Sequence, residues 1–169
     1  FRTSHEIQNV EFVDDENWKE LLDLEKVEEF RKRALNPHGH AVTSGGAEND
    51  DICFQGREAQ NVHEANIVTE AEKLFKQVSE LTGRTYAPFV YYGAKDATKV
   101  IIAMGSVTET AHEVIDDLMA KGEKVGMVKV HLYRPFSAKH LIAAIPSTVT
   151  KIAVLDRTKE PGSLGEPLY

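Results

Sequence analysis

The sequence predicts an α/β domain built on an open, parallel-rich sheet in three layers. Three short apolar runs carry this prediction, because strands buried on both faces of a parallel sheet read as nearly continuous apolar stretches. The runs lie at 100–104, 125–131 and 151–155, and segments with helical apolar spacing separate them. This alternation is typical of β-α-β units, whose crossovers are right-handed. We therefore expect three adjacent parallel strands with helices laid across them.

The segment 99–136 is the clearest of these units. Its first strand ends at Gly105, and Ser106 is placed to cap the helix that follows, with Glu109 completing a capping box. Gly122 supplies the stop at the carboxyl end of the helix. The face predicted to contact the sheet consists of Ala111, Val114, Ile115, Leu118 and Met119.

The second half of the core repeats this pattern. Pro135 ends the second strand, and Ser137 is placed to cap a helix over 138–145. The third strand then leads to Asp156 and Arg157. The sequence stops where the next helix would begin, so we expect an incomplete sheet, truncated before its last helix, in a segment excised from a longer polypeptide.

The part of the chain before the core is less regular. Helical turns are expected up to Asn36, followed by a long loop over 36–61 in which 51–55 is the only strand-like stretch. A helix is predicted over 62–82, and an extended aromatic stretch over 86–92. Loops of this length in compact domains are usually functional or lie over a neighbouring domain.

Composition excludes several classes of protein. The formal charge of −7 argues against a nucleic-acid or anionic-membrane surface. No apolar run is long enough to span a membrane, and we expect no signal peptide. Cys53 is the only cysteine among the 169 residues, which excludes an internal disulfide and a four-cysteine iron–sulfur site. A reducing cytoplasm is the compartment that this composition favours.

Ligands of open parallel sheets bind beyond the carboxyl ends of the strands. At the first such end, the free N–H groups of Gly105, Ser106 and Thr108 are candidates for an anion site. The glycine-rich fingerprints of nucleotide-binding loops are missing, so a bare capped turn is the favoured interpretation. No catalytic residue and no metal site is assigned, because the nucleophile and zinc motifs are missing and His38 and His40 have no third ligand nearby.

Charged and aromatic residues at the other strand ends are better suited to contacts between domains. Asp156 and Arg157 could pair with each other, with Arg134 or with another domain. The residues predicted to make interdomain contacts are Arg134, Pro135, Phe136, Asp156 and Arg157.

Several long strings resemble one enzyme family. They are VIIAMGSVTET, KGEKVGMVKVHLYRPFS and KIAVLDRTKEPGSLGEPLY, and FRTSHEIQ and DICFQGREA fit the same family. The chain thereby resembles pyruvate:ferredoxin (flavodoxin) oxidoreductase, also called pyruvate synthase. The resemblance implies that 1–12 is the tail of a pyrimidine-side domain, 13–98 a linker region that wraps the core, and 99–169 most of a domain similar to the carboxyl-terminal domain of transketolases.

The resemblance also implies chemistry that lies outside this segment. Enzymes of the family decarboxylate pyruvate on thiamine diphosphate with Mg²⁺, pass electrons through [4Fe-4S] clusters to ferredoxin or flavodoxin, and form acetyl-coenzyme A. They are typically cytoplasmic homodimers. Thr3, Ser4 and His5 are the residues expected nearest the cofactor, without an assigned role.

The preferred hypothesis is therefore an assembly domain that is inactive alone and contacts other domains of its chain. One alternative is a module that binds a nucleotide or coenzyme A at Gly105 and Ser106. Another is the same domain of a sister enzyme that uses a different 2-oxoacid.

Overall fold

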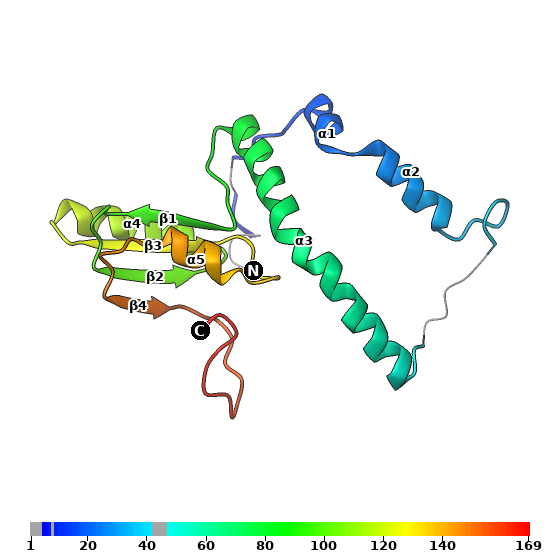
Figure 1. Cartoon of the computed structure of the whole chain (residues 1–169). Helices are drawn as coiled ribbons and strands as arrows, with labels where there is room; N and C mark the ends of the chain where they lie inside the picture. Colours follow the sequence, from blue (N-terminus) through cyan, green and yellow to red (C-terminus); the bar gives the residue numbers. More distant parts are fainter. Residues whose placement is uncertain (1–4, 8, 42–46) are drawn as a thin grey trace. The chain divides into compact units, whose positions relative to one another are not determined.

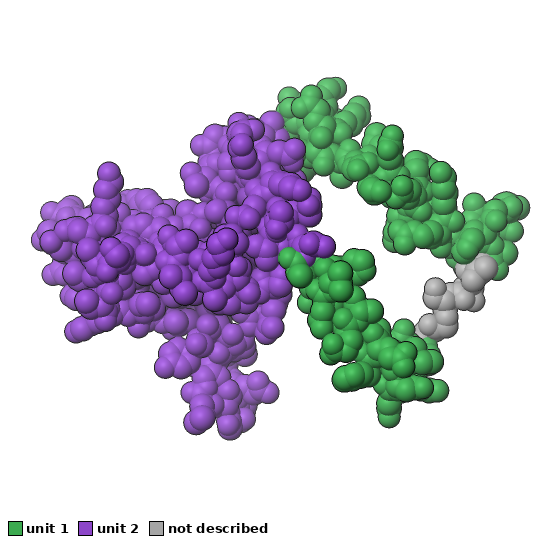
Figure 2. Space-filling view, viewed as in Figure 1, with its two compact units in different colours: residues 1–65 green, residues 66–169 purple. Residues whose placement is uncertain are grey.

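The computed structural model describes residues 5–7, 9–41 and 47–169. The chain divides into two compact units, Phe1–Ala65 and Asn66–Tyr169, which Figure 2 draws in different colours. The sheet and all buried residues belong to the second unit, because none of the described residues before 66 is buried.

The second unit contains a four-stranded sheet of order β1-β3-β2-β4 (Figure 1). Its strands are β1 (Phe89–Gly93), β2 (Lys99–Ala103), β3 (Val125–Val130) and β4 (Lys151–Val154). Strand β2 pairs in parallel with both β3 and β4, which confirms the predicted α/β class and the three adjacent parallel strands. The aromatic stretch contributes a fourth strand, β1, which the sequence did not place in the sheet and which pairs antiparallel with β3.

Helices cover the sheet from both faces. Helix α5 (Ala138–Ala144) brings Leu141 and Ala144 against the main core, and α4 (Val107–Ala120) buries Ile115 on the opposite face. Alternation along the strands assigns residues to the two faces. The buried cluster on the α5 face consists of Phe89, Ala97, Val100, Ile102, Val128 and Val130. The arrangement is therefore the three-layered one that the sequence predicts.

The start of α4 differs from the predicted capping box. Ser106 itself has helical angles (φ −63°, ψ −21°) and makes no side-chain cap hydrogen bond. A capping residue needs an extended backbone to direct its hydroxyl back at the free N–H groups, and Ser106 lacks it. Glu109 instead forms an ion pair with Lys129 at 2.7 Å. The predicted stop at the other end is present, since Gly122 has a φ of 85° and donates its N–H to the Met119 carbonyl.

The region before the sheet contains more helix than the sequence predicts. Short helices α1 (Asp15–Leu21) and α2 (Leu24–Arg33) precede α3 (Asp50–Thr82), a helix of 33 residues. The prediction of a strand-like stretch at 51–55 and of a loop as far as 61 is therefore wrong. Asp50 and Asp51 lie in the first turn of α3, where acidic residues favour the helix dipole.

Candidate functional site

The carboxyl end of β2 carries the predicted anion-site residues. Gly105 has a φ of 81°, and the Thr108 hydroxyl donates a hydrogen bond to the Gly105 carbonyl at 2.8 Å. The Thr108 N–H donates to the same carbonyl at 3.1 Å, and the Glu109 N–H donates to the Ser106 carbonyl at 3.2 Å. Thr108 is buried, so its hydroxyl serves this turn. The geometry is that of a closed turn, and the anion site stays a prediction.

The segment after β3 brings together aromatic side chains. The ring of Phe136 packs edge-on against Phe89, with 5.5 Å between the centroids, although Phe136 stays 45% exposed. The guanidinium of Arg134 lies 5.0 Å from the centroid of the Tyr133 ring, a cation–π distance. The peptide between Arg134 and Pro135 is cis. This segment therefore combines packing within the unit with an exposed aromatic and an exposed cation.

The Asp156 carboxylate has a partner that the sequence did not indicate. Its Oδ2 accepts hydrogen bonds from the backbone N–H groups of Leu168 and Tyr169 at 3.1 and 3.2 Å. No ion pair joins Asp156 to Arg134 or Arg157, although the structure describes all three residues. The carboxylate thus orders the last residues near the end of β4. Of the alternatives that the sequence left open for Asp156, pairing with another domain stays a prediction.

Sequence reasoning missed a hydroxyl–imidazole–carboxylate chain. The Ser137 hydroxyl lies 2.5 Å from Nδ1 of His140, and Nε2 of His140 lies 3.0 Å from a carboxylate oxygen of Glu72. Ser137 is the first residue outside α5 and His140 is in its first turn, so this chain ties α5 to the carboxyl half of α3. Glu72 is remote in sequence, and no local motif could have indicated the contact.

A second cluster lies between β1 and α4. The rings of Tyr92 and His112 stack at 4.0 Å, and the Tyr92 hydroxyl donates to Asp116 at 2.6 Å. This hydrogen bond, with desolvation and the charges of Asp116 and Glu113, raises the pKa of Tyr92. The cluster fastens the helix to the edge strand.

The described part of the chain shows no grouping of side chains of the kind that holds an iron–sulfur cluster or another metal centre. Among the residues that the structure describes, no group of three or more His, Cys, Asp or Glu side chains is placed to hold a metal ion. The single thiol of Cys53 cannot supply the four thiolates that a [4Fe-4S] cluster takes. Within the same described ranges, no helix has the length and apolarity that crossing a membrane requires. Thr3 and Ser4 lie outside the described residues, and His5 is exposed.

Buried parallel strands with helices on both faces define the class of this unit as an open α/β domain. Residues 97–169 match the family model described as pyruvate:ferredoxin oxidoreductase core domain II. The whole chain is 56% identical to the pyruvate-flavodoxin oxidoreductase of Enterobacter agglomerans and 50% identical to the pyruvate:ferredoxin oxidoreductase of Moorella thermoacetica. It spans 14% of the length of each relative. The resemblance seen in the sequence is confirmed, and the chain is related over its whole length to a segment of these oxidoreductases.

A solved structure of 2-oxoglutarate:ferredoxin oxidoreductase from Magnetococcus marinus is also similar. The TM-score is 0.40 at 23% identity, over 71% of this chain and 20% of that one.

Proposed function

We propose that this chain is the core-domain segment of an enzyme that converts pyruvate and coenzyme A to acetyl-coenzyme A and CO₂ and passes the electrons to ferredoxin or flavodoxin. The observation that carries the proposal is identity of 50% or more, over the whole of this chain, to a segment of each of two such oxidoreductases. In this proposal the segment supplies no reacting group. Its role is to hold neighbouring domains in register, which affects rate because a small misplacement of reacting groups is costly.

Exposed groups at the strand ends support the assembly role. Phe136 and Arg134 lie at one such end, and Phe136 keeps nearly half of its surface accessible. Aromatic and arginine side chains are enriched at protein interfaces. We propose that Arg134, Pro135, Phe136 and Arg157 contact other domains, and that Asp156 supports this edge by ordering the last residues.

The cofactors and the electron carrier belong to the rest of the enzyme in this proposal. Thiamine diphosphate, Mg²⁺ and [4Fe-4S] clusters would be held by other domains, because the residues described here do not form a metal site. The whole enzyme is proposed to be a cytoplasmic homodimer.

The test uses the complete enzyme that carries this segment. We expect pyruvate- and coenzyme A-dependent reduction of ferredoxin or flavodoxin, and no CO₂ release by the 169-residue chain supplied with pyruvate, thiamine diphosphate and Mg²⁺. Activity with another 2-oxoacid and none with pyruvate would assign the segment to a sister enzyme. In the complete enzyme, Phe136→Ala should lower the yield of assembled protein, whereas Ile142→Ala, at an exposed position of α5, should not.

A further inference from the structure

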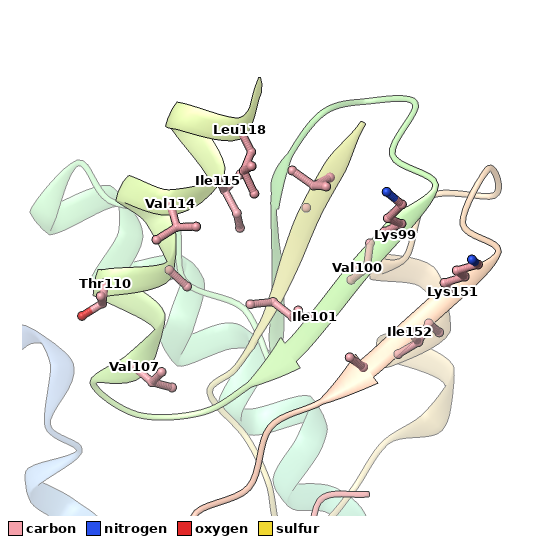
Figure 3. Close-up of a pocket in the computed structure, with 14 residues that line it drawn as sticks. Lys99, Val100, Ile101, Val107, Thr110, Val114, Ile115, Leu118, Lys151 and Ile152 are labelled. Atoms are coloured by element: carbon pink, nitrogen blue, oxygen red, sulfur yellow. The ribbon is translucent and has the colours of Figure 1, made fainter. Parts of the chain in front are cut away.

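An apolar groove of about 560 Å³ lies on the α4 face of the sheet (Figure 3). Its floor is formed mainly by strands β2 and β4, with the first two residues of β3 at its side, and its wall is α4. The lining is almost free of polar side chains apart from two lysines and one threonine. The residues that matter for the argument are Ile101, Val107, Val114, Leu118 and Ala153.

The groove exists because α4 covers only half of its face. In the sheet order β1-β3-β2-β4, α4 packs over β3 and β1. No helix among the described residues packs over β2 and β4 on this side. Val114 remains 52% exposed and Val107 39%, although both belong to the apolar side of α4. A contiguous group of exposed apolar side chains on a protein surface often marks an interaction site.

The dimensions of the uncovered half fit one helix. Neighbouring strands lie about 4.8 Å apart. Two uncovered strands therefore give a floor roughly 10 Å wide, which is the diameter of an α-helix with its side chains. Since α4 already forms one wall, a second helix laid beside it would contact α4 and the floor together.

Charge at one end of the groove indicates the direction of that helix. Lys99 and Lys151 are paired in register at the starts of β2 and β4, and both line the groove. Lys99 also lies 3.5 Å from Glu123, whereas Lys151 forms no ion pair with any described residue. A helix antiparallel to the strands would place its carboxyl end, with its partial negative charge, beside the two ammonium groups.

We propose that this groove binds one amphipathic α-helix of a polypeptide from outside these 169 residues, antiparallel to β2 and β4, with an acidic last turn at Lys99 and Lys151. The inference rests on the proposed assembly role and names the partner of that role. The relatives offer ample chain for such a helix, because this segment spans 14% of their length.

The test is a binding measurement on the 169-residue chain. The probe is a fluorescein-labelled synthetic helix of about 18 residues with a leucine stripe and glutamates in its last turn, followed by fluorescence anisotropy. Val114→Lys, which puts a charge on the exposed part of the groove, should weaken binding about tenfold. Ile142→Lys is the matched control, because Ile142 is 71% exposed on α5 at the opposite face, and it should change binding by less than about twofold.

A second set of measurements tests the charge complementarity at Lys99 and Lys151. A probe with lysines in place of the last-turn glutamates should bind about fivefold more weakly, and the Lys99→Glu, Lys151→Glu double variant should reverse this preference. If Val114→Lys does not fold, Val107→Lys is the alternative substitution that places a charge in the groove. The binding measurement involves no substrate, so it can fail while the complete enzyme still oxidises pyruvate.

Three results would overturn the inference. The first is equal binding of the probe to the wild-type chain and to folded Val114→Lys or Val107→Lys. The second is a dimer of the chain, seen by sedimentation without probe, that Val114→Lys dissociates, because a second copy would then occupy the groove. The third is an apolar dye that binds the wild type, is lost in Val114→Lys and is not displaced by the probe, which would indicate a small apolar ligand.

Discussion

Gly93 and Gly126 face each other across β1 and β3 with no room for a side chain. A Cβ added to Gly93 would lie 2.5 Å from the Gly126 Cα and 2.6 Å from the Val125 carbonyl oxygen, and the φ of Gly93 is 134°. All of these neighbours are backbone, which cannot move aside cheaply. We expect Gly93→Ala to lower the free energy of unfolding by about 3 kcal/mol, measured by urea denaturation.

Gly56 provides the contrasting substitution. It lies inside α3, and a Cβ there would have its nearest neighbour, a Glu48 carboxylate oxygen, at 3.9 Å. Gly56→Ala should therefore increase the helical circular dichroism signal and add up to about 1 kcal/mol of helix stability. A loss for Gly56→Ala equal to that for Gly93→Ala would show that the effect is not steric.

The Glu109–Lys129 pair predicts a contribution to acid stability. Its Nζ–Oε1 distance is 2.7 Å, and the Lys129 side chain is only 14% exposed whereas that of Glu109 is 74% exposed. The hydrogen bond from Lys129 holds the pKa of Glu109 below its ordinary value of 4.5, despite partial desolvation. A carboxylate with a lowered pKa in the folded state adds stability above its unfolded pKa, and this stability is lost as the pH falls through the lower folded value.

Glu109→Gln should therefore lower the free energy of unfolding at pH 7 by about 0.5 kcal/mol, a small value because solvent screens the exposed carboxylate. The deficit should shrink as the pH falls below 4.5 and disappear once the pH is below the lowered pKa of Glu109 in the folded state. Urea denaturation across this pH range measures it, with the exposed neighbour Glu113→Gln as the control. An equal deficit at both ends of the range would contradict the ion pair as its cause.

At the scale of elements, the sequence predicts best where burial is strongest. The apolar runs around Ile102 and Val128 predicted strands. Both residues are buried, and they are paired in the neighbouring parallel strands β2 and β3. The amino half of α3 was missed because, up to the start predicted at residue 62, every residue except the half-buried Cys53 is exposed. No apolar stripe therefore marks the helix period there. The sequence predicted that the residues of β1 are extended. It could not predict their antiparallel pairing at the sheet edge, because the partner strand β3 lies about 37 residues further along the chain.

The predicted sites show the same division. Gly105 was correctly predicted as the end of a strand and Gly122 as the stop of a helix, because a positive φ is a local requirement. The contacts of Asp156 and His140 were not, because Leu168 and Glu72 reach them through the tertiary fold. Local pattern therefore predicted the glycine that ends β2 and the glycine that ends α4, although not the absence of a Ser106 cap. Polar partners that are distant in the chain could not be predicted from local pattern.

Asp156 should act on a whole segment. Its carboxylate accepts the N–H groups of Leu168 and Tyr169, and Leu168 packs against the core cluster. Asp156→Ala should release residues 157–169 and increase their amide hydrogen exchange about tenfold, while exchange in β2 stays unchanged. Asp156→Asn keeps one carbonyl acceptor and should give an intermediate rate. Unchanged exchange in Asp156→Ala would contradict the role of this carboxylate in ordering the segment.

At the scale of the whole molecule, the two units differ in what can hold them folded. The second unit has its own buried core, whereas no described residue of the first is buried. Helices α1 and α2 have 7 and 10 residues, and isolated helices shorter than about 12 residues are marginal in water. We expect a chain of residues 66–169 to melt within about 2 °C of the full chain, because little of the cooperative enthalpy comes from the first unit. A much lower melting temperature, measured by calorimetry, would show that the first unit stabilises the core.

The alternative function as a small-ligand module also makes a prediction at this scale, because any ligand that binds only the folded chain raises its melting temperature. The candidate turn is occupied by its own contacts, since the Thr108 hydroxyl and N–H both bond to the Gly105 carbonyl. We therefore expect coenzyme A, ADP and pyrophosphate at about 5 mM to leave the melting temperature unchanged, whereas a site of about 0.1 mM affinity would add over 2 kcal/mol by mass action. A shift that Thr108→Val abolishes, with Thr110→Val as the control on the same helix, would move the function of this chain from assembly to ligand binding.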